Sequence, residues 1–174
     1  MVLSPKTREE WFKPFVREER VWVTIAIIIA LIMAITTVTW HVVDARHQVP
    51  TETFEVLPGE WVDRASKFAS EYRGRTIPPG TEIPLAAIQF SWIPNEIILQ
   101  AGVEYRIIVS SGDVLHGFSL IGDDGTVYNL MVMPGMAYVV HIKFDKPGIY
   151  EIRCNEYCGV GHQFMIAKIV VVQG

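Results

Sequence analysis

Residues 154–165, with the sequence CNEYCGVGHQFM, contain side chains that bind soft metal ions. The segment holds Cys154 and Cys158, which are the two cysteines of the chain, together with His162 and Met165. Thiolate, imidazole and thioether groups select copper over the hard cations, and they suit a centre that transfers electrons. The segment is therefore a candidate copper site.

The number of thiolates bears on the number of metal ions. A mononuclear blue-copper centre takes one cysteine, two histidines and a weak methionine ligand. His116, in the earlier segment VLHGF, is a candidate for the first histidine. The chain then offers one thiolate more than a single copper needs, and two thiolates can bridge two coppers.

The spacing C-x-x-x-C-x-x-x-H-x-x-M after an H-G-F segment resembles the CuA domain of cytochrome c oxidase subunit II, over residues 83–172. The single hydrophobic segment ahead of it resembles the one-helix subunit II of B-type (ba3-like) haem–copper oxidases. In that family both thiolates bridge a pair of coppers, and further donors complete each metal. The resemblance implies Cys154 and Cys158 as bridges, His116 and Met165 on one copper, and His162 with the backbone carbonyl of Glu156 on the other.

Two other uses of the cysteine pair deserve comparison. A disulfide suits cysteines outside the cytoplasm, but it needs neither a histidine nor a methionine nearby. A structural zinc site is rich in sulfur and nitrogen, but zinc does not select methionine. The neighbouring residues favour copper over both.

The composition limits the class of protein. A chain of 174 residues is about one domain with an appendage. Half of the residues are hydrophobic and 20% are charged, so part of the apolar content is expected outside a water-soluble core. The formal net charge of −4 argues against nucleic acid as a partner.

Residues 21–43 contain no Asp, Glu, Lys or Arg, and Trp22 and Trp40 lie near the two ends. A helix of this length crosses a hydrocarbon layer of ~30 Å, and aromatic residues are typical of the membrane interface, so a transmembrane helix is predicted. A cleaved signal peptide is the alternative, but the apolar run is too long for one and lacks an evident small-residue cleavage site.

The charges on either side of this helix predict its orientation. Residues 1–20 contain five Lys or Arg, whereas only Arg46 follows closely. The positive-inside rule therefore predicts a cytoplasmic segment over residues 1–20, a single pass through the inner (plasma) membrane, and a periplasmic copper domain.

Residues 44–81 are predicted to be a connector, because four prolines interrupt them. Within this connector, Trp61, Ala65, Phe68 and Tyr72 recur at helical spacing, which predicts an amphipathic helix over residues 59–73. Its apolar stripe suits the membrane surface, a partner subunit or the edge of the chain's own domain.

Residues 82–174 change to short β-rich runs separated by turn signals, and many short strands at close spacing indicate an antiparallel sandwich or barrel. The resemblance makes the fold an all-β cupredoxin-like Greek-key sandwich with one N-terminal transmembrane helix. The predicted strands cover residues 83–90, 96–100, 103–110, 117–120, 128–133, 136–144, 148–153 and 165–172.

Three further residues are candidates by resemblance. At the positions of Phe90 and Trp92, CuA domains carry aromatic residues close to the copper and to the cytochrome-docking surface. The resemblance implies that Phe90 lies beside the metal, that Trp92 is a surface contact, and that electrons enter through either residue. Ordinary core packing is the alternative for both. Glu19 aligns with an acidic residue near the mouth of the proton channel in B-type oxidases. Its other explanation is an interfacial charge that the helix dipole favours.

The function implied is that of the electron-accepting subunit of a terminal respiratory oxidase. Such a subunit takes electrons from cytochrome c and passes them to haem in subunit I, which carries haem and CuB and reduces oxygen to water. A nitrous oxide reductase carries the same motif at the end of a long soluble chain, and quinol oxidases have lost the copper ligands. A membrane-tethered copper-binding or copper-delivery module, with one exchangeable copper, is the alternative from another class.

Overall fold

The structure is a computed structural model that describes residues 17–43, 50–122 and 127–174. The chain divides into two compact units between Arg46 and His47, and each unit is considered by itself. Residues 1–16 of the predicted cytoplasmic segment and residues 44–49 of the predicted connector lie outside the described residues.

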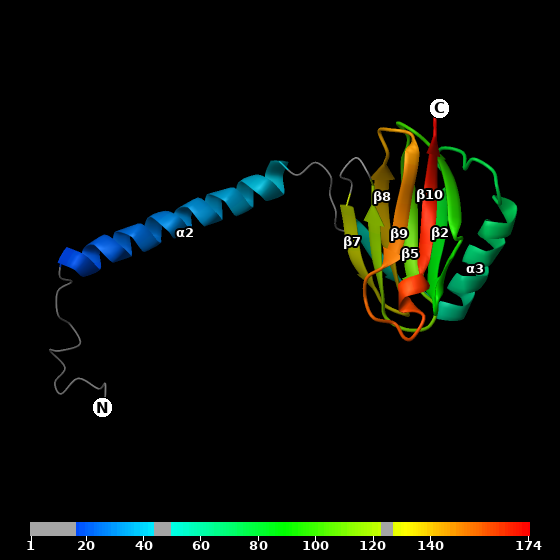
Figure 1. The fold of residues 1–174 in the computed structure, drawn as a ribbon, viewed down its shortest axis with the longest axis horizontal. Helices are drawn as coiled ribbons and strands as arrows, with labels where there is room; N and C mark the ends of the chain where they lie inside the picture. Colours follow the sequence, from blue (N-terminus) through cyan, green and yellow to red (C-terminus); the bar gives the residue numbers. More distant parts are fainter. Residues whose placement is uncertain (1–16, 44–49, 123–126) are drawn as a thin grey trace. The chain divides into compact units, whose positions relative to one another are not determined.

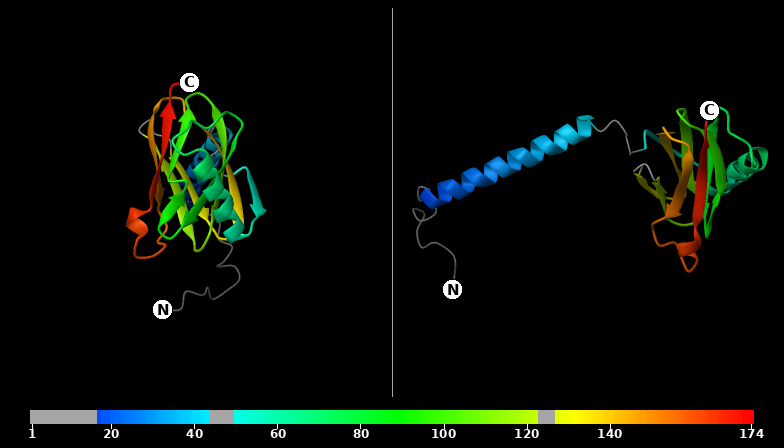
Figure 2. Two further views of the ribbon diagram at one scale, coloured as in Figure 1. Left: turned by 90° about the vertical axis from the view of Figure 1, so that its right-hand side faces the viewer. Right: turned by 45° about the horizontal axis from the view of Figure 1, so that its top comes forward.

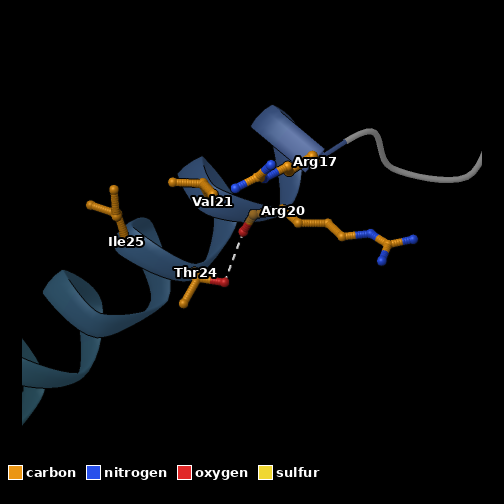
Figure 3. A pocket seen from close by; sticks show the side chains of 5 residues that line it. All are labelled: Arg17, Arg20, Val21, Thr24 and Ile25. Atoms are coloured by element: carbon orange, nitrogen blue, oxygen red, sulfur yellow. Dashed lines mark hydrogen bonds between the residues drawn. The ribbon is translucent and has the colours of Figure 1, made fainter.

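Helix α2 (Arg17–Val43) is the described part of the first unit. Its 27 residues are long enough to cross a bilayer, and none of its side chains is buried within this chain. Figure 3 shows its first turns, where Arg17 and Arg20 precede Val21 and Ile25 and the Thr24 hydroxyl donates to the Arg20 carbonyl at 2.7 Å. Such bonds let a threonine hydroxyl lie in an apolar helix.

The second unit is a sandwich of two five-stranded sheets (Figure 1). The first sheet has the order β1-β8-β5-β2-β3 and the second has the order β4-β10-β9-β6-β7. The strands are β1 (Glu52–Glu55), β2 (Glu82–Ile88), β3 (Ser91–Ile93), β4 (Glu96–Gln100), β5 (Glu104–Ser111), β6 (His116–Ile121), β7 (Val127–Val132), β8 (Met136–Lys143), β9 (Gly148–Cys154) and β10 (Ile166–Val172).

Strand periodicity carries two predicted ligands into the sandwich. Alternate residues of a strand point to the same face, and Tyr150, Ile152 and Cys154 of β9 are all buried. Cys154 is the last residue of this inward row. His116 is the first residue of β6, and it is fully buried next to the pairing of Phe118 with Cys154.

Helix α3 (Pro58–Glu71) covers the outer face of the first sheet. Trp61 and Ala65 pack against a small cluster that includes Ala86 and Ile108, and Trp61 Nε1 donates to the carbonyl of Leu85 at 3.2 Å. The apolar stripe of the predicted helix therefore packs on the chain's own sandwich. Strand β1 also falls within the predicted connector and pairs with β8.

All eight predicted strands are present, as β2 and β4 to β10, and the predicted all-β sandwich is confirmed. The sheets are not purely antiparallel as predicted, because β2 pairs with β5 and β4 pairs with β10 in parallel. A smaller difference lies at the end of β2. The first predicted strand continues to Phe90, whereas β2 ends at Ile88 because Gln89 and Phe90 form the turn into β3.

The β2–β3, β5–β6 and β9–β10 connections meet at one end of the sandwich. β2 and β5 run parallel and end together, and β9 ends where β6 begins because these two strands are antiparallel. The β9–β10 connection, which contains the short helix η1 (His162–Phe164), lies at the end opposite the C-terminus in Figures 1 and 2. The candidate ligands lie at this end, at the start of β6, at the end of β9 and in the β9–β10 connection.

Candidate metal centre

Cys154 and Cys158 are buried free thiols whose Sγ atoms lie 3.8 Å apart. This separation is almost twice the ~2.05 Å of a disulfide bond. It is also less than twice a typical metal–thiolate bond of ~2.3 Å. Both sulfurs can therefore contact the same metal ion, and each remains able to contact a second.

The other four predicted donors lie around the two sulfurs, two beside each. His116 Nδ1 is 3.7 Å and the Glu156 carbonyl oxygen is 3.2 Å from Sγ of Cys154. His162 Nδ1 is 3.6 Å and Met165 Sδ is 3.9 Å from Sγ of Cys158. The structure thus brings all six predicted donors together.

His116 is held by Asp113, a residue that the sequence analysis did not single out. His116 Nε2 donates to Asp113 Oδ1 at 2.8 Å, which leaves Nδ1 directed to the sulfur of Cys154. A carboxylate on the distal nitrogen fixes the tautomer and the orientation of a ligating imidazole. Partial burial raises the pKa of Asp113, but hydrogen bonds from His116 and from the backbone of Gln89 and Val114 outweigh it, so the pKa is lowered overall.

The thiol of Cys158 is poorly acidic without metal. Burial is the main cause, and the hydrogen bond with Cys154 adds to it, so the pKa of Cys158 is raised to about 11. The thiol is then protonated at neutral pH. Because a thiolate is the form that binds metal, metal binding must release this proton.

Phe90 lies directly on the β9–β10 connection. A Cβ atom added to Gly161 would come within 2.5 Å of the Phe90 ring, and one added to Gly159 would come within 2.9 Å. Gly159 also has φ +133°, a conformation that favours glycine. The two glycines therefore allow the close approach of Phe90 to the β9–β10 connection.

Trp92 does not lie where it was predicted. It is 1% exposed, so the prediction of a surface contact is wrong. Its Nε1 donates to the carbonyl of Met165 at 3.4 Å, and its ring centroid is 6.5 Å from that of His116. Trp92 is thus a buried residue that packs beside His116 and Met165. It points inward from β3 because alternate residues of a strand face the core.

A close approach also occurs at Gly117, next to His116. A Cβ atom at this position would overlap the side chain of Asn155, whose Nδ2 donates to Asn129 Oδ1 at 2.6 Å. The backbone N–H of Asn155 donates to the carbonyl of Gly117 at 3.2 Å. These contacts fasten the first residue after Cys154 to strands β6 and β7.

Sequence reasoning missed Asp113 and Gln89. A weak signal existed for Asp113, which stands three residues before His116 in a Ser-Gly-Asp turn. Gln89 had no signal, because only the fold brings its side chain to the carbonyl of Cys158. Glu19 lies exposed in the first turn of α2, which belongs to the helical unit of the chain.

The β9–β10 connection presents three large side chains to solvent. Tyr157, Val160 and Phe164 are 77%, 84% and 74% exposed. The ring centroid of Tyr157 is 6.0 Å from that of His162. The site therefore has a buried side at His116 and an exposed apolar side at His162.

A sandwich of two five-stranded sheets with a buried cluster of thiol, imidazole and thioether groups at one end defines the class of cupredoxin-like metal proteins. Residues 67–173 match the family model described as cytochrome c oxidase subunit II, periplasmic domain. This match covers more than half of the chain. The chain belongs to the cytochrome c oxidase subunit II family.

Individual relatives agree with this assignment. The chain is 38% identical over 113 residues to cytochrome c oxidase subunit 2 of Thermus thermophilus, which covers 65% of this chain and 78% of that protein. A second subunit 2 sequence from the same species is also 38% identical over 113 residues, which is 62% of its length. A chain of a haem–copper terminal oxidase dimer, solved by cryo-electron microscopy, superposes with a TM-score of 0.65 at 28% identity and covers 90% of this chain and all of that one.

The family confirms the predicted function as subunit II of an oxidoreductase complex, and it does not favour the copper-delivery alternative. The family also implies copper binding, and buried His116, Cys154 and Cys158 form a possible metal site among the described residues. Together with α2, it makes the chain a membrane-anchored subunit.

Proposed function

We propose that this chain is the electron-entry subunit of a terminal oxidase and that it holds a pair of coppers. Cytochrome c is the proposed electron donor. The proposed acceptor is haem in subunit I, which carries haem and CuB and reduces oxygen to water. Bound copper supplies the one-electron redox chemistry, and this chain holds the metal and exposes it to the donor.

The observation that carries the proposal is the distribution of donors around the sulfurs. In the proposed assignment, His116 and Met165 serve one copper, and His162 and the Glu156 carbonyl serve the other. Cys154 lies beside one donor of each set, His116 and Glu156, and Cys158 lies beside the other two. Two thiolates that each border both sets suit a pair of bridges.

The protein can limit movement at the site when an electron arrives or leaves. Cys154 and His116 belong to paired strands, and Asp113 orients the imidazole. Trp92 donates a hydrogen bond to the backbone carbonyl of Met165. A scaffold of this kind keeps the donors in place, because densely packed interiors resist small displacements.

Docking of cytochrome c is supported by the exposed residues of the β9–β10 connection. Tyr157, Val160 and Phe164 give this loop an apolar surface beside His162, and exposed apolar patches mark interaction sites. Phe90 packs against the same loop at Gly159 and Gly161, and we take it as the better of the two candidates for electron entry. Trp92, which is buried beside His116 and Met165, is a second candidate for electron entry.

The proposed orientation follows from the flanking charges. Five Lys or Arg before the apolar stretch place residues 1–20 in the cytoplasm and the copper domain in the periplasm, with α2 in the inner membrane. Electrons then enter on the periplasmic side. Glu19 lies on the opposite side in this arrangement, where a proton-entry role is proposed for it.

Metal counting and electron paramagnetic resonance on the full chain in detergent test the proposal. We expect two coppers per chain, with one unpaired electron shared between two copper nuclei in the oxidised form. A delivery module would instead hold one exchangeable copper. One copper per chain, or a signal confined to one nucleus, would overturn the proposal.

A further inference from the structure

Gln89, in the β2–β3 turn, contacts both the β5–β6 connection, which precedes His116, and the β9–β10 connection, which carries Cys158. Its backbone N–H donates to Asp113 Oδ2 at 2.6 Å, and the same carboxylate accepts from Nε2 of His116 at 2.8 Å. Its side-chain Nε2 donates to the backbone carbonyl of Cys158. One residue outside the donor set therefore connects the segment that orients His116 with the loop that carries Cys158.

The contact with Cys158 lies where glycine leaves room for it. A Cβ atom added to Gly159 would come within 3.1 Å of Gln89 Nε2 and 2.9 Å of the Phe90 ring. The Gln89 amide therefore reaches the Cys158 carbonyl through a space that a side chain at position 159 would fill.

The position of Cys158 affects most of the site. Its Sγ lies within 3.9 Å of the sulfurs of Cys154 and Met165 and within 3.6 Å of Nδ1 of His162. A shift of the Cys158 backbone changes all three separations together. A hydrogen bond to its carbonyl is well placed to restrict that shift.

We propose that Gln89 is a positioning residue of the copper site, whose side-chain amide holds the Cys158 backbone while its own N–H holds the carboxylate that orients His116. In the copper-bound chain this contact keeps the donor atoms at fixed distances from one another. This role in the copper-bound chain rests on the proposed copper centre. In the metal-free chain it keeps the two sulfurs apart. Closing them from 3.8 Å to the ~2.05 Å of a disulfide requires the loop to move.

Three variants of the full chain in detergent separate the hydrogen bond from its surroundings. Gln89→Leu removes the donor at similar size. Gln163→Leu is the matched control, because Gln163 is an exposed glutamine on the same loop, in η1. Gln89→Lys restores a donor of similar reach.

The first measurement is made without metal. Glutathione disulfide oxidises the two thiols to the Cys154–Cys158 disulfide; the thiols lose two electrons and two protons, and the reagent becomes two glutathione thiols. We expect Gln89→Leu to oxidise about twofold to tenfold faster than wild type, the range that one hydrogen bond accounts for. Gln163→Leu and Gln89→Lys should oxidise at close to the wild-type rate. Equal rates in Gln89→Leu and Gln89→Lys, whatever their thermal stability, would overturn the proposal.

The second measurement uses copper-loaded chains. Gln89→Leu should release copper to a chelator about twofold to tenfold faster and should change the copper hyperfine pattern, and Gln89→Lys should restore the release rate. If Gln89→Leu had the same hyperfine pattern and the same copper release rate as Gln163→Leu, Gln89 would not be a positioning residue. A wild-type chain without a copper pair would refute the proposed function, while the metal-free rates would still decide the role of Gln89.

Discussion

The β-sandwich and helix α2 obtain their functional geometry in different ways. In the sandwich, His116 and Cys154 are far apart in sequence and are joined by strand pairing, a shared core and cross-loop hydrogen bonds. In α2, by contrast, Thr24 and Thr37 bond back to carbonyls four residues earlier, and no side chain is buried within the chain. All six proposed copper donors therefore lie within the sandwich, whereas α2 contributes none of them.

This contrast predicts that substitutions in the sandwich alter copper in the isolated chain and that substitutions in α2 do not. The largest effect is expected for Cys158→Ser, because this sulfur borders three other donors. The copper count should fall from two to at most one, and the shared unpaired electron should disappear. Metal analysis and electron paramagnetic resonance measure both. Two coppers with an unchanged spectrum would show that Cys158 is not a bridge.

The two histidines should differ because one side of the site is buried and the other is exposed. His116→Gly removes a fully buried imidazole and its bond to Asp113, which is expected to lower the free energy of unfolding by about 2 to 4 kcal/mol. His162→Gly should leave the fold nearly unchanged, because this ring is half-buried on a loop. Imidazole added to copper-loaded chains should restore the spectrum of His162→Gly much faster than that of His116→Gly. Chemical unfolding and stopped-flow spectroscopy measure these differences, and equal behaviour of the two variants would remove the distinction.

Met165→Leu should have a smaller effect. A thioether is a weak axial ligand in copper centres, so it tunes the metal more than it holds it. The variant is expected to keep two coppers with a changed reduction potential, because leucine fills the buried space without offering a donor. Voltammetry and metal analysis test this. Loss of copper equal to that of Cys158→Ser would show that the assigned roles of these ligands are wrong.

The sequence indicates a copper site chiefly because four candidate side chains lie in one short segment, whereas His116 and the Glu156 carbonyl come in through the resemblance. Cysteine, histidine and methionine in one twelve-residue segment indicate copper without any knowledge of the fold. The strands were predictable for a similar reason, since β10 alternates buried Ala167, Ile169 and Val171 with Lys168. Local pattern is enough where one residue type or one period determines the outcome.

The supporting contacts were not predictable, because they depend on which loops meet. Strand β1 is exposed along its length and carries no inward row of apolar residues, so only its pairing with β8 defines it. The resemblance implied a surface contact for Trp92, and nothing in QFSWIP reveals that β3 begins at Ser91 and turns this ring inward. Asp113 and Gln89 likewise act across connections, and their roles emerge only when the sheets are assembled.

The smallest effect on copper is expected for substitution of Glu19, which tests the expectation that substitutions in α2 leave the copper site unchanged. Glu19 lies in the first turn of α2, where the helix dipole favours a carboxylate whatever its role. Glu18 shares that turn, so Glu18→Gln is the matched control. Neither variant should change the copper count or spectrum of the chain.

If Glu19 supplies protons on the cytoplasmic side, Glu19→Gln should slow oxygen reduction severalfold in the assembled oxidase and leave electron transfer from cytochrome c into the copper centre unchanged. Turnover equal to that of wild type and of Glu18→Gln across pH, in a correctly assembled complex, would leave Glu19 with the interfacial role alone.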